Sequence, residues 1–200
     1  MPCAQRPLIF AAAAAWSPSL AFRPQRLATS AIRRNETSPL SRLKTLGYLD
    51  NVLALEAAVA AGADDALLLG TRGTVCCTSA ANVFVLEGDR LSTPPVRDGV
   101  LPGTLRALLL ALAPECGLQP VERSVAWAEL GAADAVLTTS SVRLVAPAVS
   151  LDGEPVRGAG SAKVRDLSER VRREIARACG TALPAREAQA DPGSGRSGIR

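Results

Sequence analysis

Residues 44–70 read KTLGYLDNVLALEAAVAAGADDALLLG and contain the clearest change of hydrophobic period in the chain. Apolar residues recur at helical spacing from Leu46 to Ala61, and Gly62 predicts the end of that helix. The apolar run at 65–70 then predicts a buried strand. Lys44 stands in the loop directly before the predicted helix, so the lysine, the helix and the strand form one local unit.

Strands and helices continue to alternate on both sides of this unit. The segment VCCTSAANVF at 75–84 is rich in small residues and is interpreted as a packed turn that leads into a strand over 82–87. Gly88 and Asp89 predict a hairpin turn. Further strands are expected at 26–34, 119–125 and 135–141, and further helices from 104, over 127–134 and over 162–178. This order predicts a mixed α/β or α+β domain.

Composition limits the possible chemistry. The chain has 200 residues, 48% of them hydrophobic, which suits one domain with a substantial core. It contains no histidine, which excludes Ser-His-Asp and Cys-His catalysis and histidine-ligated metal sites. Five cysteines occur without a CxxC pair, and this odd number predicts reduced thiols, a cytoplasmic location and no metal site.

Charge and hydropathy argue against two classes of partner. The formal charge is +4, and the densest basic stretch, RVRREIAR at 170–177, is interleaved with glutamates at helical spacing. That pattern indicates a solvated helix face rather than a nucleic-acid surface. The stretch PLIFAAAAAW at 7–16 is similar to a short signal-peptide core, but no clear cleavage site follows, and nothing is long enough to span a membrane. We therefore expect neither nucleic acid nor a membrane as a partner.

Lys44 is one of only two lysines in the chain. Lysine, unlike arginine, can lose its proton near neutral pH and act as an amine nucleophile. A position at a helix start among Leu43, Leu46 and Leu49 would lower its pKa, because the helix dipole and apolar surroundings disfavour the ammonium form. Such an amine forms a Schiff base with an aldehyde. The alternative, from position alone, is an ordinary exposed lysine.

Two other segments suit a phosphate group. The sequence PGTLR at 102–106 opens a helix, and helix N-terminal amides favour anions. The sequence TTSS at 138–141 places four hydroxyls at the end of a strand. Each signal is weak alone, because many helices begin with Pro-Gly and many strands end in polar residues.

Taken together, these segments resemble a known family. The stretches at 44–69, 78–85 (TSAANVFV), 92–113 (STPPVRDGVLPGTLRALLLALA) and 135–156 (AVLTTSSVRLVAPAVSLDGEPV) follow the order and spacing of the class IV aminotransferases. These fold type IV pyridoxal-phosphate enzymes include branched-chain and D-amino acid aminotransferases and aminodeoxychorismate lyases. The resemblance implies their larger C-terminal α/β domain, with a mixed barrel-like sheet flanked by helices. It also implies pyridoxal 5'-phosphate as the cofactor and a homodimer.

The resemblance assigns roles to the matching residues. Lys44 matches the lysine that carries the cofactor as an internal aldimine and moves a proton between substrate and cofactor. Thr104 and Leu105 match the pair at a helix start that holds the cofactor phosphate, where Leu105 offers its backbone amide. Ser140 and Ser141 match a hydroxyl pair on the phosphate and substrate sides, so Ser141 is also expected at the substrate.

Three further positions match with differences in chemistry. Cys77 stands where the family has an acid that pairs with the protonated pyridine nitrogen of the cofactor, and a neutral thiol does not balance that charge as a carboxylate does. Asn82, five residues later, matches a near-constant asparagine with a structural role. Arg143 stands where lyase-like members carry an arginine, so we expect it to bind a substrate carboxylate; a surface arginine is the alternative.

Two departures concern the loop and the domain organisation. Gly47 stands where many members have asparagine, which would loosen the loop beside Lys44. The family's smaller N-terminal domain is expected to be mostly missing. Residues 1–40 match the end of that region and the interdomain linker, 41–180 match the cofactor-binding domain, and 181–200 are expected to form a disordered tail.

The leading hypothesis is a pyridoxal-phosphate-dependent class IV aminotransferase that transfers an amino group between an amino acid and a 2-oxo acid. The second is an aminodeoxychorismate lyase, which releases 4-aminobenzoate and pyruvate, because TTSSVRLVAP is slightly more similar to lyase members. The third is a truncated, catalytically inactive domain, which follows from Cys77 and the expected loss of the N-terminal domain.

Overall fold

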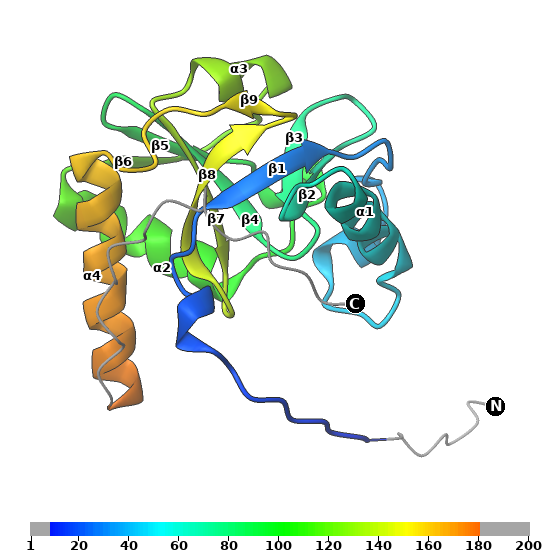
Figure 1. Cartoon of the computed structure of the whole chain (residues 1–200), viewed down its shortest axis with the longest axis horizontal. Helices are drawn as coiled ribbons and strands as arrows, with labels where there is room; N and C mark the ends of the chain where they lie inside the picture. Colours follow the sequence, from blue (N-terminus) through cyan, green and yellow to red (C-terminus); the bar gives the residue numbers. More distant parts are fainter. Residues whose placement is uncertain (1–8, 181–200) are drawn as a thin grey trace, which may run out of the picture.

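A computed structural model describes residues 9–180 of the chain (Figure 1). Nine strands and four α-helices, joined by short 3₁₀ segments, make up this part. The strands are β1 (Gln25–Thr29), β2 (Asp65–Leu69), β3 (Val75–Thr78), β4 (Asn82–Glu87), β5 (Arg90–Thr93), β6 (Gln119–Glu122), β7 (Ala135–Ser140), β8 (Leu144–Leu151) and β9 (Glu154–Pro155). The helices are α1 (Leu49–Ala60), α2 (Thr104–Leu112), α3 (Trp127–Ala132) and α4 (Ala162–Cys179).

The sheet closes into a ring, which confirms the predicted barrel-like α/β fold. Its strand order is β3-β2-β1-β8-β7-β4-β5-β6, and a further pairing between β3 and β4 joins the ring's two ends. Strand β1 pairs in parallel with both β2 and β8, whereas the other four pairs of the ring are antiparallel, so the sheet is mixed. Strands β5 and β6 extend from β4 outside the ring, and β9 pairs with β8.

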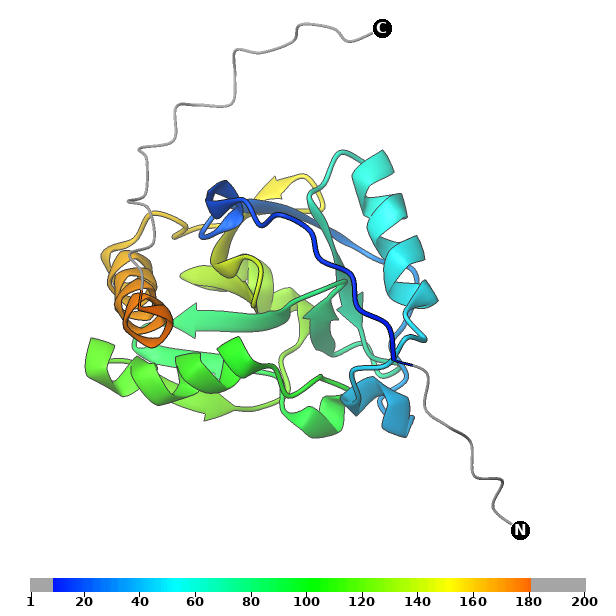
Figure 2. The same ribbon diagram turned by 90° about the horizontal axis from the view of Figure 1, so that it is seen from below.

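Three apolar clusters fill the domain. The first lies inside the ring and is made mostly of Leu and Val from the strands, including Leu27, Val83 and Val136. The second lies between the sheet and helices α2 and α4, around Phe84, Leu109 and Leu167. The third cluster is made mostly of small residues and joins α1 to β2 and β3; it consists of Ala54, Ala58, Ala66, Leu68, Cys76, Cys77 and Val100. Figures 1 and 2 show α4 and α1 on opposite sides of the ring.

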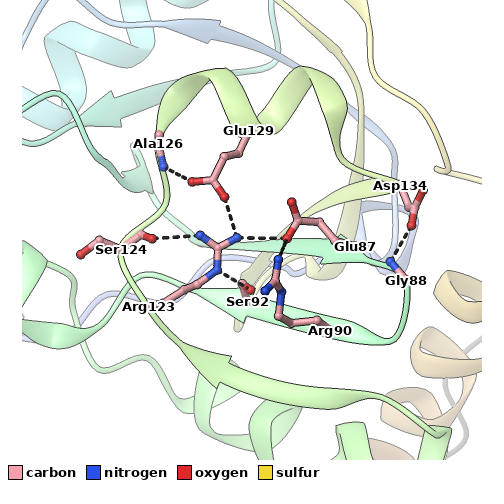
Figure 3. A network of polar contacts seen from close by, with 9 residues as sticks. All are labelled: Glu87, Gly88, Arg90, Ser92, Arg123, Ser124, Ala126, Glu129 and Asp134. Atoms are coloured by element: carbon pink, nitrogen blue, oxygen red, sulfur yellow. Dashed lines mark hydrogen bonds and ion pairs between the residues drawn. The ribbon is translucent and has the colours of Figure 1, made fainter.

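Helix α3 covers one end of the ring and is held there by Arg123 (Figures 1 and 3). The Arg123 guanidinium donates to Glu87 at 3.1 Å and to Ser92 at 3.0 Å, and forms an ion pair with Glu129 at 2.6 Å. Glu129 in turn accepts the backbone N–H of Ala126 at 2.6 Å and so caps α3. The bond to Glu129 is the main cause that raises the pKa of Arg123. One arginine therefore connects α3 to the β4–β5 hairpin.

Several element predictions are wrong in extent. The strand expected over 26–34 ends at Thr29, because the Ser30 hydroxyl accepts the N–H of Ile32 and turns the chain out of the sheet. The helix expected from Leu46 begins at Leu49. The strand expected over 119–125 ends at Glu122, and the helix expected over 127–134 ends at Ala132.

The interpretation of 75–81 as a packed turn is also wrong. Residues Val75–Thr78 form the buried strand β3, which pairs with β2 and β4. The turn is shorter than expected and lies at 78–81, where Thr78 donates its N–H to the carbonyl of Ala81 at 2.8 Å. Small thiol side chains fit this crowded position, because α1 packs on the same cluster. The expected disordered tail lies outside the described residues, and the division of the chain at residue 41 stays a prediction.

Candidate functional site

The loop that carries Lys44 joins the 3₁₀ helix η2 (Pro39–Arg42) to α1. Lys44 is exposed, and its Nζ lies 5.1 Å from the centre of the Tyr48 ring, a cation–π contact. The expected apolar surroundings are absent: Leu43, Leu46 and Leu49 are 57%, 88% and 67% exposed. Lys44 also lies five residues before α1 rather than at its first turn. The expected apolar surroundings of Lys44 and its expected position at the helix start are therefore both wrong.

The two predicted phosphate segments meet in space. The hydroxyl oxygens of Thr104 and Ser141 lie 3.3 Å apart, although 37 residues separate them in the chain. Thr104 opens α2, and Gly103, the residue before it, provides no side chain to cap the first-turn amides. Both hydroxyls are exposed. An uncapped helix N-terminus beside two hydroxyls is an arrangement that suits a phosphate dianion.

Asn82 fixes the start of α2 to the sheet, as its expected structural role requires. Its side-chain amide donates to the carbonyl of Leu101 at 2.9 Å. Its amide oxygen lies only 2.1 Å from the place where a Cβ on Gly103 would stand. The chain therefore needs glycine at 103, because any side chain there would displace Asn82 from Leu101.

The four hydroxyls of 138–141 have different environments. Thr138 donates to the carbonyl of Ala146 at 3.2 Å, and Ser140 accepts the N–H of Arg143 at 3.1 Å, so both hold the β7–β8 hairpin. Thr139 is 2% exposed, and its hydroxyl has no hydrogen-bond partner among residues 9–180. Ser141 is the member that meets Thr104. Ser140 thus serves the turn in this structure, and its expected phosphate contact stays a prediction.

Cys77 belongs to a row of paired residues on three neighbouring strands, β3, β4 and β7. It pairs with Asn82 on β4, and Asn82 pairs with Thr139 on β7. Directly opposite residues point to the same face of a sheet, so these three side chains share one face. Neighbouring strands are about 4.8 Å apart, which places Cys77 and Thr139 roughly 10 Å from each other. The row thus spans from the expected pyridine end to the expected phosphate end.

The Cys77 thiol is neutral at physiological pH. It is 7% exposed, and burial raises its pKa to about 11, although Arg34 opposes this shift. Its neighbour Cys76 is fully buried, donates to the carbonyl of Asp98 at 2.8 Å, and has its pKa raised to about 12, mainly by burial. Neither cysteine provides the negative charge that the family's acid would bring to this position.

A polar network beneath the Lys44 loop was not predicted from the sequence. The hydroxyl of Tyr48 and the side-chain amide of Asn51 both donate to the carbonyl of Ser79, Asn51 at 2.7 Å. The Ser79 hydroxyl donates to buried Asp65 at 2.5 Å. Burial is the main cause that raises the pKa of Tyr48, and Cys77 contributes. The signal available in the sequence was that Tyr48 is the only tyrosine in the chain.

A cavity of about 210 Å³ opens beside the same loop. Its lining includes Arg33, Arg34, Thr45, Tyr48 and Asn51. Thr45 follows Lys44 directly, so the cavity borders the loop, whereas the lysine side chain lies over Tyr48. The cavity is thus a concave surface next to the loop that carries Lys44.

Arg143 lies half-buried in the turn after Ser141. Its backbone carbonyl accepts the N–H of Phe22 at 2.9 Å, which ties the segment before β1 to the β7–β8 turn. Its guanidinium forms no hydrogen bond or ion pair within residues 9–180. The expected contact with a substrate carboxylate stays a prediction.

Metal-binding groups, membrane-spanning helices and cysteine pairs concern the part of the chain that the structure describes. It contains no group of His, Cys, Asp and Glu residues that could hold a metal ion. None of its helices is both long enough and apolar enough to cross a bilayer. The four cysteines placed in this part are unpaired thiols.

The residues present fit the phosphate end of pyridoxal phosphate and differ at its pyridine end. Thr104, Ser141 and the uncapped α2 amides supply donors, and the unpartnered Thr139 hydroxyl lies on the same face as Asn82. Lys44 is accessible for covalent attachment. At the opposite end a buried neutral thiol replaces the expected carboxylate.

Comparisons with known proteins agree with this geometry. The family described as Amino-transferase class IV matches residues 2–151. A candidate branched-chain-amino-acid aminotransferase of Methanocaldococcus jannaschii is 33% identical over 76% of this chain and 53% of its own length. The chain thus spans about half the length of such relatives.

Two solved structures share the fold. The branched-chain aminotransferase of Thermoproteus uzoniensis with norvaline superposes with a TM-score of 0.76 and 28% identity, covering 82% of this chain and 55% of that one. A candidate 4-amino-4-deoxychorismate lyase of Legionella pneumophila superposes with a TM-score of 0.69 and 34% identity, covering 72% and 54%.

The contact between Gly103 and Asn82 predicts the effect of Gly103→Ala. The new methyl group displaces Asn82 from Leu101 and shifts the start of α2, so affinity for inorganic phosphate is expected to fall roughly tenfold. Equilibrium dialysis with inorganic phosphate measures this change. Gly131→Ala is the matched control, because a methyl group there meets nothing within 4 Å. Equal phosphate affinity in wild type and Gly103→Ala would contradict the arrangement.

The raised thiol pKa values predict how stability depends on pH. Above about pH 9 the unfolded chain loses thiol protons that the folded chain retains at Cys76 and Cys77, so the free energy of unfolding decreases from about pH 9 to about pH 11. Denaturant titrations across this range measure the slope. A variant with both Cys76→Ala and Cys77→Ala is expected to show a shallower slope, and an unchanged slope would show that these thiols are not buried.

Proposed function

The chain belongs to the class IV aminotransferases, and from this premise we propose that it binds pyridoxal 5'-phosphate and transfers an amino group between an amino acid and a 2-oxo acid. The observation that carries the proposal is the meeting of Thr104 and Ser141 at the uncapped start of α2. These two segments are distant in sequence, and each matches a phosphate-binding position of the family. Because the chain spans about half of its relatives, the activity of a whole enzyme is part of the proposal.

Each residue of the chain has a distinct task in this proposal. Lys44 would hold the cofactor through its Nζ, and the same amine would take a proton from the substrate Cα. Thr104 and Ser141 donate hydrogen bonds to the phosphate, and the amide of Leu105 adds a third donor. When bound, the cofactor supplies the ring that withdraws electrons from the substrate. The chain orients that ring.

The thiol at 77 changes how strongly the ring withdraws electrons. A carboxylate would hold a proton on the pyridine nitrogen by charge, whereas the buried neutral thiol of Cys77 leaves that position without a counter-charge. The proton is therefore held less tightly, and proton abstraction from the substrate is expected to be slower than with an acid. We therefore expect a low turnover rate, with cofactor binding retained.

A second candidate function is the lyase reaction that forms 4-aminobenzoate and pyruvate. The observation in its favour is the match to the Legionella protein named as a candidate lyase, at 34% identity, which is similar to the 33% identity of the Methanocaldococcus relative named as an aminotransferase. Arg143, half-buried beside Ser141, would bind a substrate carboxylate in either reaction. Release of 4-aminobenzoate, measured against amino transfer to 2-oxoglutarate, separates the two functions.

A homodimer is part of the proposal, supported by apolar residues around the Lys44 loop. Five leucines of this segment are between 45% and 88% exposed: Leu40, Leu43, Leu46, Leu49 and Leu53. An exposed set of this kind is common where two chains meet. Sedimentation equilibrium tests the assignment, and a monomer at all concentrations would contradict it. A reducing cytoplasmic location remains a prediction from the unpaired cysteines.

Substitution of each lysine by alanine in turn provides a matched test of the cofactor site. After incubation with pyridoxal phosphate and reduction with borohydride, wild type and Lys163→Ala are expected to carry the cofactor mass on Lys44, and Lys44→Ala is expected to carry none. Lys163 pairs with Asp89 at the far side of the ring and so reports unspecific labelling. Peptide mass spectrometry locates the label. Equal labelling of both lysines, or of neither, would contradict the proposal and favour an inactive domain.

A further inference from the structure

Arg34 lies at the point where three segments of the candidate site meet. Its backbone N–H donates to the carbonyl of Leu69 at 2.9 Å, and it forms a bridge with Gly70, so its main chain is fixed to the end of β2. The residue is half-buried and lines the cavity beside the Lys44 loop. A side chain that starts from a fixed backbone beside this cavity is well placed to hold the segments around it.

The Arg34 guanidinium bonds to three oxygens from three different segments. Nη2 donates to the carbonyl of Ser41 at 2.6 Å, and Nη1 lies 3.5 Å from the side-chain oxygen of Asn51. Ser41 comes three residues before Lys44, and Asn51 lies in the first turn of α1 after it. The same guanidinium therefore binds residues on both sides of the Lys44 loop.

The third bond reaches toward the phosphate end of the site. Nε of Arg34 donates to the carbonyl of Gly99 at 2.5 Å. Gly99 ends the 3₁₀ helix η3 (Val96–Asp98) and begins the short connection to Gly103 and α2. Its backbone φ is +82°, and a Cβ at this position would lie 2.9 Å from the Glu36 Cα, so the turn requires glycine. Arg34 thus connects the Lys44 loop to the segment that leads into the start of α2.

The role of Arg34 depends on geometry more than on ion pairing. Among the described residues it forms no salt bridge with a carboxylate, and all three acceptors are neutral oxygens. A planar guanidinium offers five N–H groups in fixed directions, which suits three acceptors that lie apart. The single nitrogen of a lysine cannot reach Ser41 and Gly99 in the same way. The neighbouring Arg33 lines the same cavity and is exposed, and it forms no hydrogen bond or ion pair in the described part of the chain.

We propose that Arg34 is a positioning residue that sets the distance and orientation between Lys44 and the α2 phosphate end through its bonds to Ser41, Asn51 and Gly99. Lys44 and the phosphate donors must hold opposite ends of one small cofactor, and a displacement of about 1 Å between such groups lowers reaction rates by up to roughly 100-fold. The expected effect on the reaction rate rests on the proposed function, whereas the positioning itself rests on the three hydrogen bonds of Arg34.

The test uses three variants of the full chain. Arg34→Met removes all three hydrogen bonds. Arg34→Lys keeps the positive charge but lacks the planar guanidinium that donates in several directions. Arg33→Met is the matched control. The first measurement is the rate at which Lys44 is labelled by pyridoxal phosphate, followed by absorbance and, after borohydride reduction, by mass. The second is tryptic cleavage after Arg42 and Lys44, which lie in or beside the loop. Thermal unfolding records the global stability of each variant.

Both Arg34 variants are expected to label Lys44 roughly tenfold more slowly and to be cleaved at Arg42 and Lys44 roughly tenfold faster than wild type. Arg33→Met is expected to match wild type in both measurements. If Arg34→Met fails to fold, Arg34→Lys decides, because it preserves the charge and most of the packing. A purely structural residue would lower the unfolding temperature and leave the labelling rate of the folded protein unchanged, which would overturn the proposal.

A failure of the proposed function and a failure of the positioning role of Arg34 give different results. If wild type takes up no cofactor on Lys44, the proposed function is wrong, and the cleavage rates still decide whether Arg34 holds the loop. If wild type is labelled and both Arg34 variants are labelled and cleaved at the wild-type rates, the positioning role is wrong and the proposed function stands.

Discussion

The backbone pairing of β3 with β4 is the constraint on which the rest of the structure depends. Through Cys77 and Asn82 this pairing closes six strands into a ring, and the ring's interior forms an apolar core. Closure also removes two exposed strand edges. The same pair sets the site, because Asn82 anchors Leu101 and the start of α2, while Cys77 takes the position beneath the expected pyridine. The β3–β4 hairpin therefore both closes the ring and positions the candidate site.

The sequence predicted the parts of the site whose chemistry is local. The hydroxyls at 104 and 141 and the glycine at 103 were visible as motifs, and the structure brings Thr104 and Ser141 together. Long-range packing was less accessible. The strand at 75–78 looked like a turn, because it lies in a run of small residues, and only its pairing with β2 and β4 reveals the strand.

The surroundings of Lys44 show a second limit of sequence reasoning. Leucines around a lysine suggested burial, yet these leucines point outward, and the loop is held instead by polar bonds. The residues that make those bonds, Arg34, Tyr48 and Ser79, lie in three separate segments of the chain. No local pattern connects them, since their contacts exist only after the ring has closed. Cys77 was foreseen as the unusual position, and its burial explains why it stays neutral.

Chemical-shift mapping with pyridoxal phosphate tests the central claim most directly, namely that Lys44, Cys77 and the α2 start form one site. Backbone amide resonances of the ¹⁵N-labelled chain are compared before and after the cofactor is added. The largest shifts are expected to occur together at 43–48, 77–82, 103–106 and 139–142. Shifts confined to another surface, or to the Lys44 loop without the α2 start, would contradict it.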